Sequence, residues 1–316
     1  MYKVRKGTLF LPNLSPMLPV NTTFASFMVI VRSSEALQTL IKKLRRDGKT
    51  IGFVPTMGAL HPGHLSLVKN AQKQNDIVVV SIFVNPTQFN DPKDFKLYPR
   101  TTEQDIYLLE KAGCNTLFLP PTDDIYPVGT AQLPHYELGY LETILEGKYR
   151  PGHFQGVCQV VDRLMTLVTP DRLYLGQKDY HQCMVLKKLL SLTGSSAQIE
   201  ICPTLREADG LAMSSRNVRL DSRERSLATG IFRALTFISS ELQPGSLAAI
   251  KEGALQLLSE SHFRPDYIEI ADAGTLQLQP AWDGKKKIVA LIAAFMGEVR
   301  LIDNMILPLN FANYAN

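Results

Sequence analysis

The chain of 316 residues lacks the glycine-rich signatures of the commonest nucleotide-binding folds. Neither the P-loop pattern G-x-x-x-x-G-K-[ST] nor the dinucleotide pattern G-x-G-x-x-G occurs in it. It contains no apolar run long enough to cross a bilayer, and its four cysteines form no Cys-x-x-Cys pair. These absences argue against a P-loop ATPase, a dinucleotide-binding dehydrogenase, a membrane protein and a small disulfide-built domain.

The cysteines are scattered, and three of them sit in apolar or periodic segments. Buried free thiols are the simplest interpretation of Cys114, Cys158, Cys183 and Cys202. This usage fits a reducing compartment, so we expect a cytoplasmic protein.

The chain also has little net charge, because its 34 basic side chains nearly balance its 30 acidic ones and leave a formal charge of +4. That excess is too small to indicate a nucleic-acid partner or a membrane surface, so any anion site must be local. A hydrophobic share of 45% is typical of a globular protein, and the length favours two cooperating domains.

Short β-branched runs alternate with helix-period segments between residues 28 and 204. This alternation predicts an α/β fold with a Rossmann-like parallel sheet. We expect strands at 29–31, 50–55, 77–83, 116–119, 172–175 and 199–202, and helices at 34–46, 64–74, 102–112, 155–168 and 180–192. Ligands of such sheets bind beyond the carboxyl ends of the strands.

The two flanking regions have different patterns. Residues 1–27 carry three basic and no acidic side chains around a broken apolar stretch, which we interpret as a disordered extension in preference to a targeting peptide. Residues 205–316 are expected to form a smaller C-terminal α/β lid domain. Asp221 and Glu224, at capping-box spacing, predict a helix start near Ser222.

The segment VPTMGALHPGHLSLV predicts a strand, a tight turn at Gly58 and a helix that begins at Pro62. His61 and His64 then flank a helix N-terminus, where backbone N–H groups and imidazoles favour phosphate, and Gly63 lets a ligand approach the backbone. The alternative to a nucleotide site is a capped helix at which the two histidines have no binding role. A zinc site would need a third ligand such as His153 or His181.

Polar residues follow two further predicted strands. In SIFVNPTQF, the amides of Asn85 and Gln88 could fix a carboxylate or hydroxyl of a small substrate, or simply satisfy their own loop. In DRLYLGQKDYHQ, Lys178 could hold phosphate and Asp179 a ribose hydroxyl, or the two could form a solvated pair.

The segment PTLREADGLAMSSRN opens the second predicted domain with Ser214, Ser215 and Arg216 in a row. Two hydroxyls and a guanidinium suit the oxygens of a polyphosphate, and a loop beside a hinge could bring them to bound ATP. A serine-rich turn is the alternative.

Together, the segments PTMGALHPGH, SIFVNPTQF, YPRT, RPGHF, GQKDYHQ and READGLAMSSRN resemble the pantothenate synthetases in order and spacing, from Val29 to Leu307. The run His61-x-Gly63-His64 is similar to the HxGH signature of class I aminoacyl-tRNA synthetases and related nucleotidyltransferases. Residues 213–217 resemble the second, mobile signature of those enzymes.

The resemblance implies an ATP-dependent acid–amine ligase. It would condense pantoate with beta-alanine through a pantoyl adenylate, release AMP and pyrophosphate, and act in the biosynthesis of pantothenate, a coenzyme A precursor. It further implies a homodimer with small-molecule substrates. The small net charge already led us to expect no nucleic-acid or membrane partner. The alternative within the HxGH enzymes is another adenylate-forming enzyme or nucleotidyltransferase that acts on a different acid. A metal hydrolase and a silent nucleotide sensor are alternatives from other classes.

The resemblance also assigns roles to residues. Those that would bind ATP are Met57, Gly58, Ala59, Leu60, His61, Pro62, Gly63, His64, Gly176, Gln177, Lys178, Asp179, Leu205, Met213, Ser214, Ser215 and Arg216. Among them, four would be catalytic by stabilising charge as pyrophosphate leaves: His64, His61, Lys178 and Arg216.

Two glutamines are assigned to the acid substrate in the same way. Gln88 and Gln182 would bind pantoate, Gln88 would also lie next to beta-alanine, and Asn85 joins this substrate group. Mg²⁺ would accompany ATP, with Asp105 as the candidate protein ligand and Glu103 also available. Gln104 departs from the pair of acids that relatives often carry there.

Overall fold

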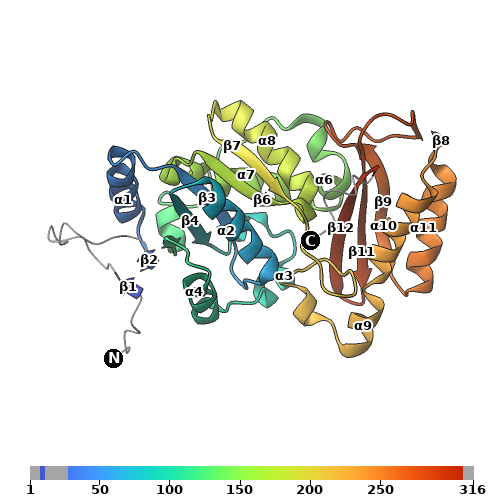
Figure 1. The fold of residues 1–316 in the computed structure, drawn as a ribbon, viewed down its shortest axis with the longest axis horizontal. Coiled ribbons are helices and arrows are strands. Elements are labelled where there is room, and N and C mark those ends of the chain that lie inside the picture. Colours follow the sequence, from blue (N-terminus) through green and yellow to red (C-terminus); the bar gives the residue numbers. More distant parts are fainter. Residues whose placement is uncertain (1–7, 11–27, 309–316) are drawn as a thin grey trace. The chain divides into compact units, whose positions relative to one another are not determined.

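The computed structural model describes residues 8–10 and 28–308 (Figure 1). The chain divides into two compact units, which are described separately. The first consists of Met1–Glu142, Arg150–Gly176 and Val185–Cys202, and the second of Thr143–Tyr149, Gln177–Met184 and Pro203–Asn316. The division predicted at residue 204 therefore lies two residues from the observed change, but two internal segments also group with the second unit.

The first unit contains a seven-stranded sheet in which every pair of neighbouring strands is parallel. This arrangement confirms the predicted α/β class with a Rossmann-like parallel sheet. Its strands, in the spatial order β1-β2-β5-β4-β3-β6-β7, are β1 Thr8–Phe10, β2 Met28–Val31, β5 Thr116–Phe118, β4 Ile77–Ile82, β3 Ile51–Thr56, β6 Arg172–Gly176 and β7 Gln198–Cys202.

All six predicted strands of this sheet are present, with ends within about two residues of those expected. The strand β1 was not predicted, because it lies in the segment that we interpreted as an extension. The rest of that prediction concerns residues 1–7 and 11–27, which lie outside the described residues.

Helices cover both faces of the sheet. They are α1 Ser34–Arg46, α2 Pro62–Gln74, α3 Pro92–Leu97, α4 Thr102–Lys111, α5 Thr122–Ile125, α7 His153–Val168 and the part of α8 Tyr180–Thr193 from Val185 onward, with 3-10 turns η1 Pro86–Gln88 and η2 Gly139–Glu142. The 3-10 turn η3 Gln177–Asp179 and the first residues of α8 belong to the second unit. On one face, Leu67 of α2 and Leu109 of α4 pack on Val54 and Val80. Phe53 is fully buried but points to the opposite face, where α7 contacts β3 and α1.

The strand order fixes where a ligand is expected. From β3 the chain proceeds to β4 and β5 on one side, and later to β6 and β7 on the other side. The strands β3 and β6 are hydrogen-bonded neighbours, so the order reverses between them. In open parallel sheets this reversal opens a crevice at the carboxyl ends of the two strands. The segments that follow β3 and β6 begin with Met57 and Gln177.

The second unit is built on an antiparallel sheet in the order β12-β11-β9. Its elements are α6 Leu145–Tyr149, η4 Asn217–Arg219, α9 Ser222–Leu227, α10 Gly230–Glu241, β8 Gly245–Ser246, α11 Ala248–Glu260, β9 Arg264–Asp272, β10 Ala281–Trp282, β11 Ile288–Met296 and β12 Val299–Leu307. Leu235 and Ile238 of α10 pack on the inward residues Ile288, Ala290 and Ile292 of β11.

The predicted helix start at Ser222 is correct. The Asp221 carboxylate accepts a hydrogen bond from the backbone N–H of Glu224. In return, the Glu224 carboxylate accepts one from the backbone N–H of Asp221. The apolar run after it is divided between α9 and α10, a break that the pattern did not indicate. In the described ranges no helix has the length and apolar character to span a bilayer. All four cysteines are free and buried, as expected, and desolvation raises the pKa of Cys114 and of Cys158 to about 12.

Candidate active site

The loop after β3 makes a sharp turn that depends on a buried carboxylate. Gly58 has a φ of +81°, a conformation that glycine adopts without strain, and Ala59 also has a positive φ of 49°. Asp105, in α4, is only 1% exposed. One of its oxygens accepts from the backbone N–H of Leu60 at 2.8 Å and from the Thr101 hydroxyl at 3.1 Å, and the other accepts from the N–H of Ala59 at 3.0 Å.

These bonds give Asp105 a structural role that the sequence did not predict. Both carboxylate oxygens accept hydrogen bonds from the loop and the side chain is buried at the wall of the cavity, so Asp105 positions the loop, and its contact with Mg²⁺ stays a prediction. In the part of the chain that the structure describes, no group of three His, Cys, Asp or Glu side chains could hold a metal ion. The zinc alternative, with His153 or His181 as a third ligand, therefore has no geometric support.

The two histidines of the HxGH segment stand at the N-terminus of α2, as predicted. His61 is the N-cap residue and Pro62 begins the helix. The backbone N–H of His61 donates to Nδ1 of His64 at 3.4 Å, and the two ring centroids are 4.0 Å apart. Because Nδ1 of His64 accepts this bond, the ring proton of the neutral tautomer resides on Nε2, which can donate to a phosphate oxygen.

Asn85 lies at the centre of a buried network in the first unit. It is 1% exposed, and its Nδ2 donates to Oε1 of Gln88 at 3.1 Å and to the carbonyl oxygen of Gly156 at 3.0 Å. Its Oδ1 accepts from the Tyr126 hydroxyl at 2.8 Å. Burial raises the pKa of Tyr126, which keeps this hydroxyl protonated as a donor. With its polar atoms engaged, Asn85 positions Gln88, and its own contact with the substrate stays a prediction.

Gln88 is held from several directions. Its Nε2 contacts the sulfur of Met57 at 3.1 Å, and its carbonyl oxygen accepts from Nδ1 of the buried His153 at 2.8 Å. On the other side of that ring, Arg150 lies 3.1 Å from Nε2 of His153. The motif RPGHF thus supports the turn that carries Gln88.

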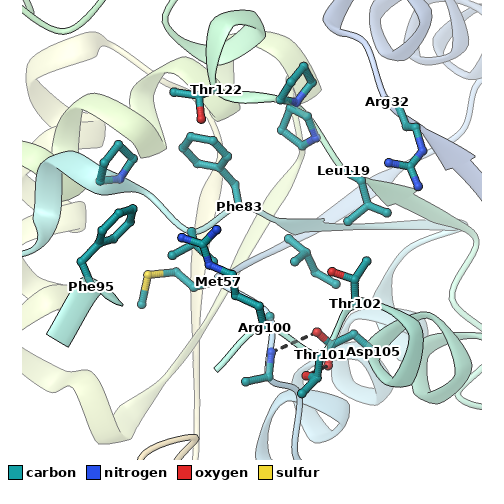
Figure 2. Close-up of a pocket in the computed structure, with 17 residues that line it drawn as sticks. Arg32, Met57, Phe83, Phe95, Arg100, Thr101, Thr102, Asp105, Leu119 and Thr122 are labelled. Atoms are coloured by element: carbon teal, nitrogen blue, oxygen red, sulfur yellow. Dashed lines mark hydrogen bonds between the residues drawn. The ribbon is translucent and has the colours of Figure 1, made fainter. Parts of the chain in front are cut away.

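A cavity of about 540 Å³ opens at the carboxyl edge of the first unit's sheet (Figure 2). It is lined by residues that follow β2, β3, β4 and β5, and it includes Met57, Gly58 and Ala59. The guanidinium groups of Arg32 and Arg100 point into it in Figure 2, and neither forms an ion pair with a described residue. The cavity therefore offers positive charge beside the loop that was predicted to bind ATP.

In the second unit, the loop Gln177–Asp179 is held by a residue of β12. The side-chain amide of Asn304 donates to the carbonyl oxygens of Gln177 and Lys178, each at 2.8 Å. The Lys178 ammonium lies 3.8 Å from the Asp179 carboxylate, and the lysine side chain is only 19% exposed. The lysine of this pair is thus largely buried, whereas the side chain of Asp179 is 49% exposed. Gln182 follows in the first turn of α8 and is half-buried.

The other predicted ATP segments of the second unit fold around a turn. The N–H of Met213 donates to the carbonyl oxygen of Leu205 at 3.0 Å, which brings these two predicted residues together. The N–H of Arg216 donates to the hydroxyl of Ser214 at 3.2 Å, so the serine–arginine run is locally ordered. Ser214, Ser215 and Arg216 are all half-buried.

The structure thus gathers the predicted residues into two sets. In the first unit lie Met57 to His64, Asn85, Gln88, Asp105 and Gly176, the last residue of β6. In the second unit lie Gln177 to Asp179, Gln182, Leu205 and Met213 to Arg216. The supporting residues that the sequence did not reveal are Tyr126, Asn304, and the ion pair of Arg206 with Asp303, which lie 2.6 Å apart. Only the polar pair Asp303–Asn304 inside an apolar strand could have been noticed beforehand.

The chain matches the family model described as pantoate-beta-alanine ligase over residues 29–306. It is 44% identical over 283 residues to the pantothenate synthetase of Porphyromonas gingivalis, covering 88% of this chain and 99% of that protein. It is 45% identical to that of Aeromonas hydrophila, covering 89% of this chain and 99% of the relative.

Solved structures give the same result. The crystal structure of pantothenate synthetase from Thermus thermophilus aligns with a TM-score of 0.81 at 40% identity, covering 87% of this chain and 98% of that one. The crystal structure of pantoate-beta-alanine ligase from Francisella tularensis complexed with beta-gamma ATP and beta-alanine aligns with a TM-score of 0.75 at 37% identity, covering 88% of this chain and 97% of that one.

Proposed function

Because the chain belongs to the pantoate-beta-alanine ligase family, we propose that it condenses pantoate with beta-alanine at the expense of ATP, forming pantothenate. It is a ligase, and it acts in pantothenate biosynthesis. One structural observation carries the proposal from this chain's own geometry. The strands β3 and β6 are neighbours at the reversal of strand order, and the HxGH segment follows one while the GQKD segment follows the other.

We propose that the first step forms pantoyl adenylate and pyrophosphate. The carboxylate of pantoate is ionised at neutral pH, so it can attack the α-phosphorus of ATP without a general base. The bond from that phosphorus to the bridging oxygen breaks, and pyrophosphate leaves with the electron pair. Catalysis then depends on holding the reactants and neutralising charge.

The second step transfers the pantoyl group to beta-alanine. The neutral amine attacks the acyl carbonyl, the bond to the phosphate oxygen breaks, and AMP leaves. The amine loses a proton in this step. This order of events accounts for AMP and pyrophosphate as the products of ATP.

The roles assigned to residues are part of the proposal. Nε2–H of His64 is suited to donate to an oxygen of the reacting phosphates, because Nδ1 is engaged by the backbone of His61. His61, Lys178 and Arg216 would stabilise the negative charge of the leaving pyrophosphate. The remaining ATP contacts are assigned to Met57–Gly63, Gly176, Gln177, Asp179, Leu205 and Met213–Ser215. Asp179 would bind the ribose and Leu205 would offer its backbone to adenine.

Gln88 and Gln182 are proposed to bind pantoate, and Gln88 is also proposed to lie next to beta-alanine. The support for Gln88 is its placement, because Asn85, His153 and Met57 all fix the turn or the amide. A glutamine that is fixed before the substrate arrives loses little entropy on binding. This arrangement favours selection of one acid.

Mg²⁺ is proposed to enter with ATP, bound through the phosphates. The Asp105 carboxylate already accepts hydrogen bonds from the loop. Among the described residues no group of three side chains could hold a metal ion. Both observations argue against a Mg²⁺ site built from protein ligands alone. Mg²⁺ commonly keeps several waters and binds through substrate phosphates. The ion would add positive charge to the reacting polyphosphate, and no protein residue needs to be assigned to it.

We also propose a cytoplasmic homodimer. The four free, buried cysteines suit a reducing compartment. The dimer follows from the family resemblance, and a monomeric mass in light scattering would contradict it.

The direct test is pyrophosphate release by the purified protein with Mg²⁺-ATP. Pantoate and beta-alanine are supplied separately and then together. We expect sustained release only with both acids, with AMP and pantothenate formed in equal amounts. If folded, ATP-binding protein gave no turnover with pantoate but did so with another acid, the alternative HxGH enzyme would replace this assignment.

A further inference from the structure

Two consecutive polar residues lie inside β12, a strand whose neighbouring side chains are largely apolar. Asn304 is 2% exposed and Asp303 is 4% exposed, whereas Leu301, Met305 and Leu307 belong to the core of the second unit. Burying an amide or a carboxylate is unfavourable unless its polar atoms find partners. The partners of these two side chains therefore indicate what they do.

Both polar atoms of the Asn304 side chain hydrogen-bond to the loop Gln177–Asp179. Its Nδ2 donates to the carbonyl oxygens of Gln177 and Lys178, both at 2.8 Å, and its Oδ1 accepts from Nε2 of Gln177 at 3.2 Å. One side chain thereby fixes two consecutive peptide groups and a neighbouring amide. This loop joins β6 to α8 and carries Lys178, the cation assigned above to the phosphates.

Asp303 faces a second segment. It receives two hydrogen bonds from Arg206, at 2.6 and 3.1 Å, and a third from the backbone N–H of Asn304 at 2.8 Å. The arginine is itself only 15% exposed, donates to the carbonyl oxygen of Gly210 at 3.0 Å and stacks on the ring of Phe232 at 4.5 Å. The guanidinium of Arg206 is therefore fixed both by hydrogen bonds to Asp303 and by stacking of its plane on Phe232.

The segment that Arg206 anchors is the one that joins Leu205 to Met213. Arg206 pairs with Ala212 in an isolated antiparallel bridge, and the N–H of Met213 donates to the carbonyl oxygen of Leu205 at 3.0 Å. Adjacent residues of one strand thus hold two segments, Gln177–Asp179 and Leu205–Met213. Both segments were assigned to ATP, and both belong to the second unit.

We propose that Asn304 is a positioning residue for ATP, acting through the backbone of Gln177 and Lys178, with Asp303 acting through Arg206 on Leu205 and Met213. The inference rests on the proposed function and deepens it. In this proposal, both side chains act on protein groups and neither contacts ATP directly. Asn304 fixes the backbone of the loop before ATP arrives, so presenting the ammonium of Lys178 costs less entropy at binding.

Three substitutions separate this role from a contribution to stability alone. Asn304→Ala removes the whole contact, whereas Asn304→Ser keeps one donor. Asn304→Asp has nearly the same shape but has no N–H, and its carboxylate would face the carbonyl oxygens of Gln177 and Lys178. The matched control is Ser261→Ala, which removes a 3% exposed side chain that bonds to Arg233 and Leu257 in the same unit.

The measurements are the dissociation constant for ATP without pantoate, kcat and KM for each substrate, and the unfolding temperature. We expect ATP affinity to fall about tenfold or more in Asn304→Ala and Asn304→Asp and less in Asn304→Ser. KM for beta-alanine should stay within about twofold, because Gln88 belongs to the other unit. Ser261→Ala should lower the unfolding temperature and leave ATP affinity unchanged.

The outcomes are distinguishable. Folded Asn304→Asp or Asn304→Ser protein with wild-type affinity for ATP would overturn the inference, even if its unfolding temperature fell. If Asn304→Ala does not fold, the other two substitutions still decide the question. Absence of pantoate-dependent pyrophosphate release from the wild-type protein would instead contradict the proposed function, while the binding constants would continue to test Asn304.

Discussion

The carboxylate of Asp105 accepts the backbone N–H groups of Ala59 and Leu60, at 3.0 and 2.8 Å, from a helix that begins 42 residues later in the chain than Leu60. The loop that it holds contains two consecutive residues with positive φ, Gly58 and Ala59. A backbone in that conformation persists only when its surroundings determine it. The helix α4 thus shapes the entrance to the HxGH segment through the side chain of Asp105.

Asp105→Asn should weaken the loop because an amide can accept only through Oδ1, while its NH₂ would face a backbone donor. We expect a loss of about 1–3 kcal/mol in the free energy of unfolding and a higher KM for ATP. Urea unfolding and initial-rate kinetics measure the two effects. The control is Glu103→Gln, an exposed acid in the first turn of the same helix. If both variants behaved alike, the loop would not depend on Asp105.

Gly156→Ala should disturb Gln88. A Cβ at position 156 would collide with the carbonyl oxygen of Thr87, in the 3-10 turn that ends at Gln88. We expect KM for pantoate to rise about tenfold or more, together with a loss of about 1–3 kcal/mol in stability. Gly274→Ala is the control, because its Cβ would meet no atom closer than 3.4 Å. A wild-type KM for pantoate in Gly156→Ala would show that the turn adapts.

The sequence predicted the sheet and the positions of the site segments well, for a physical reason. Strands of a parallel sheet are buried on both faces, so β3 and β4 appear as apolar runs, and Pro62 and Asp221 mark helix starts by local chemistry. The supporting contacts could not be predicted in this way. The partners Asp105–Leu60 and Asn304–Lys178 lie 45 and 126 residues apart in sequence, and no local pattern encodes such pairs.

The structural contacts of Asp105 and Asn85 could not be predicted for the same reason. A carboxylate or an amide beside a strand end looks the same in sequence whether it faces a ligand or the backbone. Asp105 was grouped with the metal and Asn85 with the substrate, and in the structure each hydrogen-bonds to a backbone segment distant in sequence, Asp105 to Leu60 and Asn85 to Gly156. Burial decides between these uses, because the two side chains are only 1% exposed.

Acid should weaken the first unit partly through Asp76. Backbone and side-chain hydrogen bonds from Thr50 lower the pKa of Asp76 from 3.8 to about 2. A lowered pKa means that the folded state favours the carboxylate, so this contribution is complete above about pH 4 and is lost as the pH falls toward 2. The wild type should therefore exceed Asp76→Asn in urea midpoint at pH 5, and the difference should shrink by pH 2.5. The control Asp47→Asn alters an exposed carboxylate without a described side-chain hydrogen bond. A difference for Asp76→Asn that did not change with pH would show that Thr50 does not favour the carboxylate.

His64→Ala should abolish most adenylation while the protein remains folded. Nδ1 of His64 accepts from the N–H of His61, so Nε2–H is the group that is lost to the reacting phosphates. We expect pantoate-dependent pyrophosphate release to fall by about 100-fold or more, since removing one charge-stabilising donor commonly has that effect. The control is His135→Ala, which changes an exposed histidine whose ring lies 3.7 Å from Glu137. His64→Gln can still donate but cannot reproduce the ring geometry, and it should retain more activity than His64→Ala. Near-normal release by folded His64→Ala would remove His64 from the reaction and leave His61, Lys178 and Arg216 to stabilise the leaving pyrophosphate.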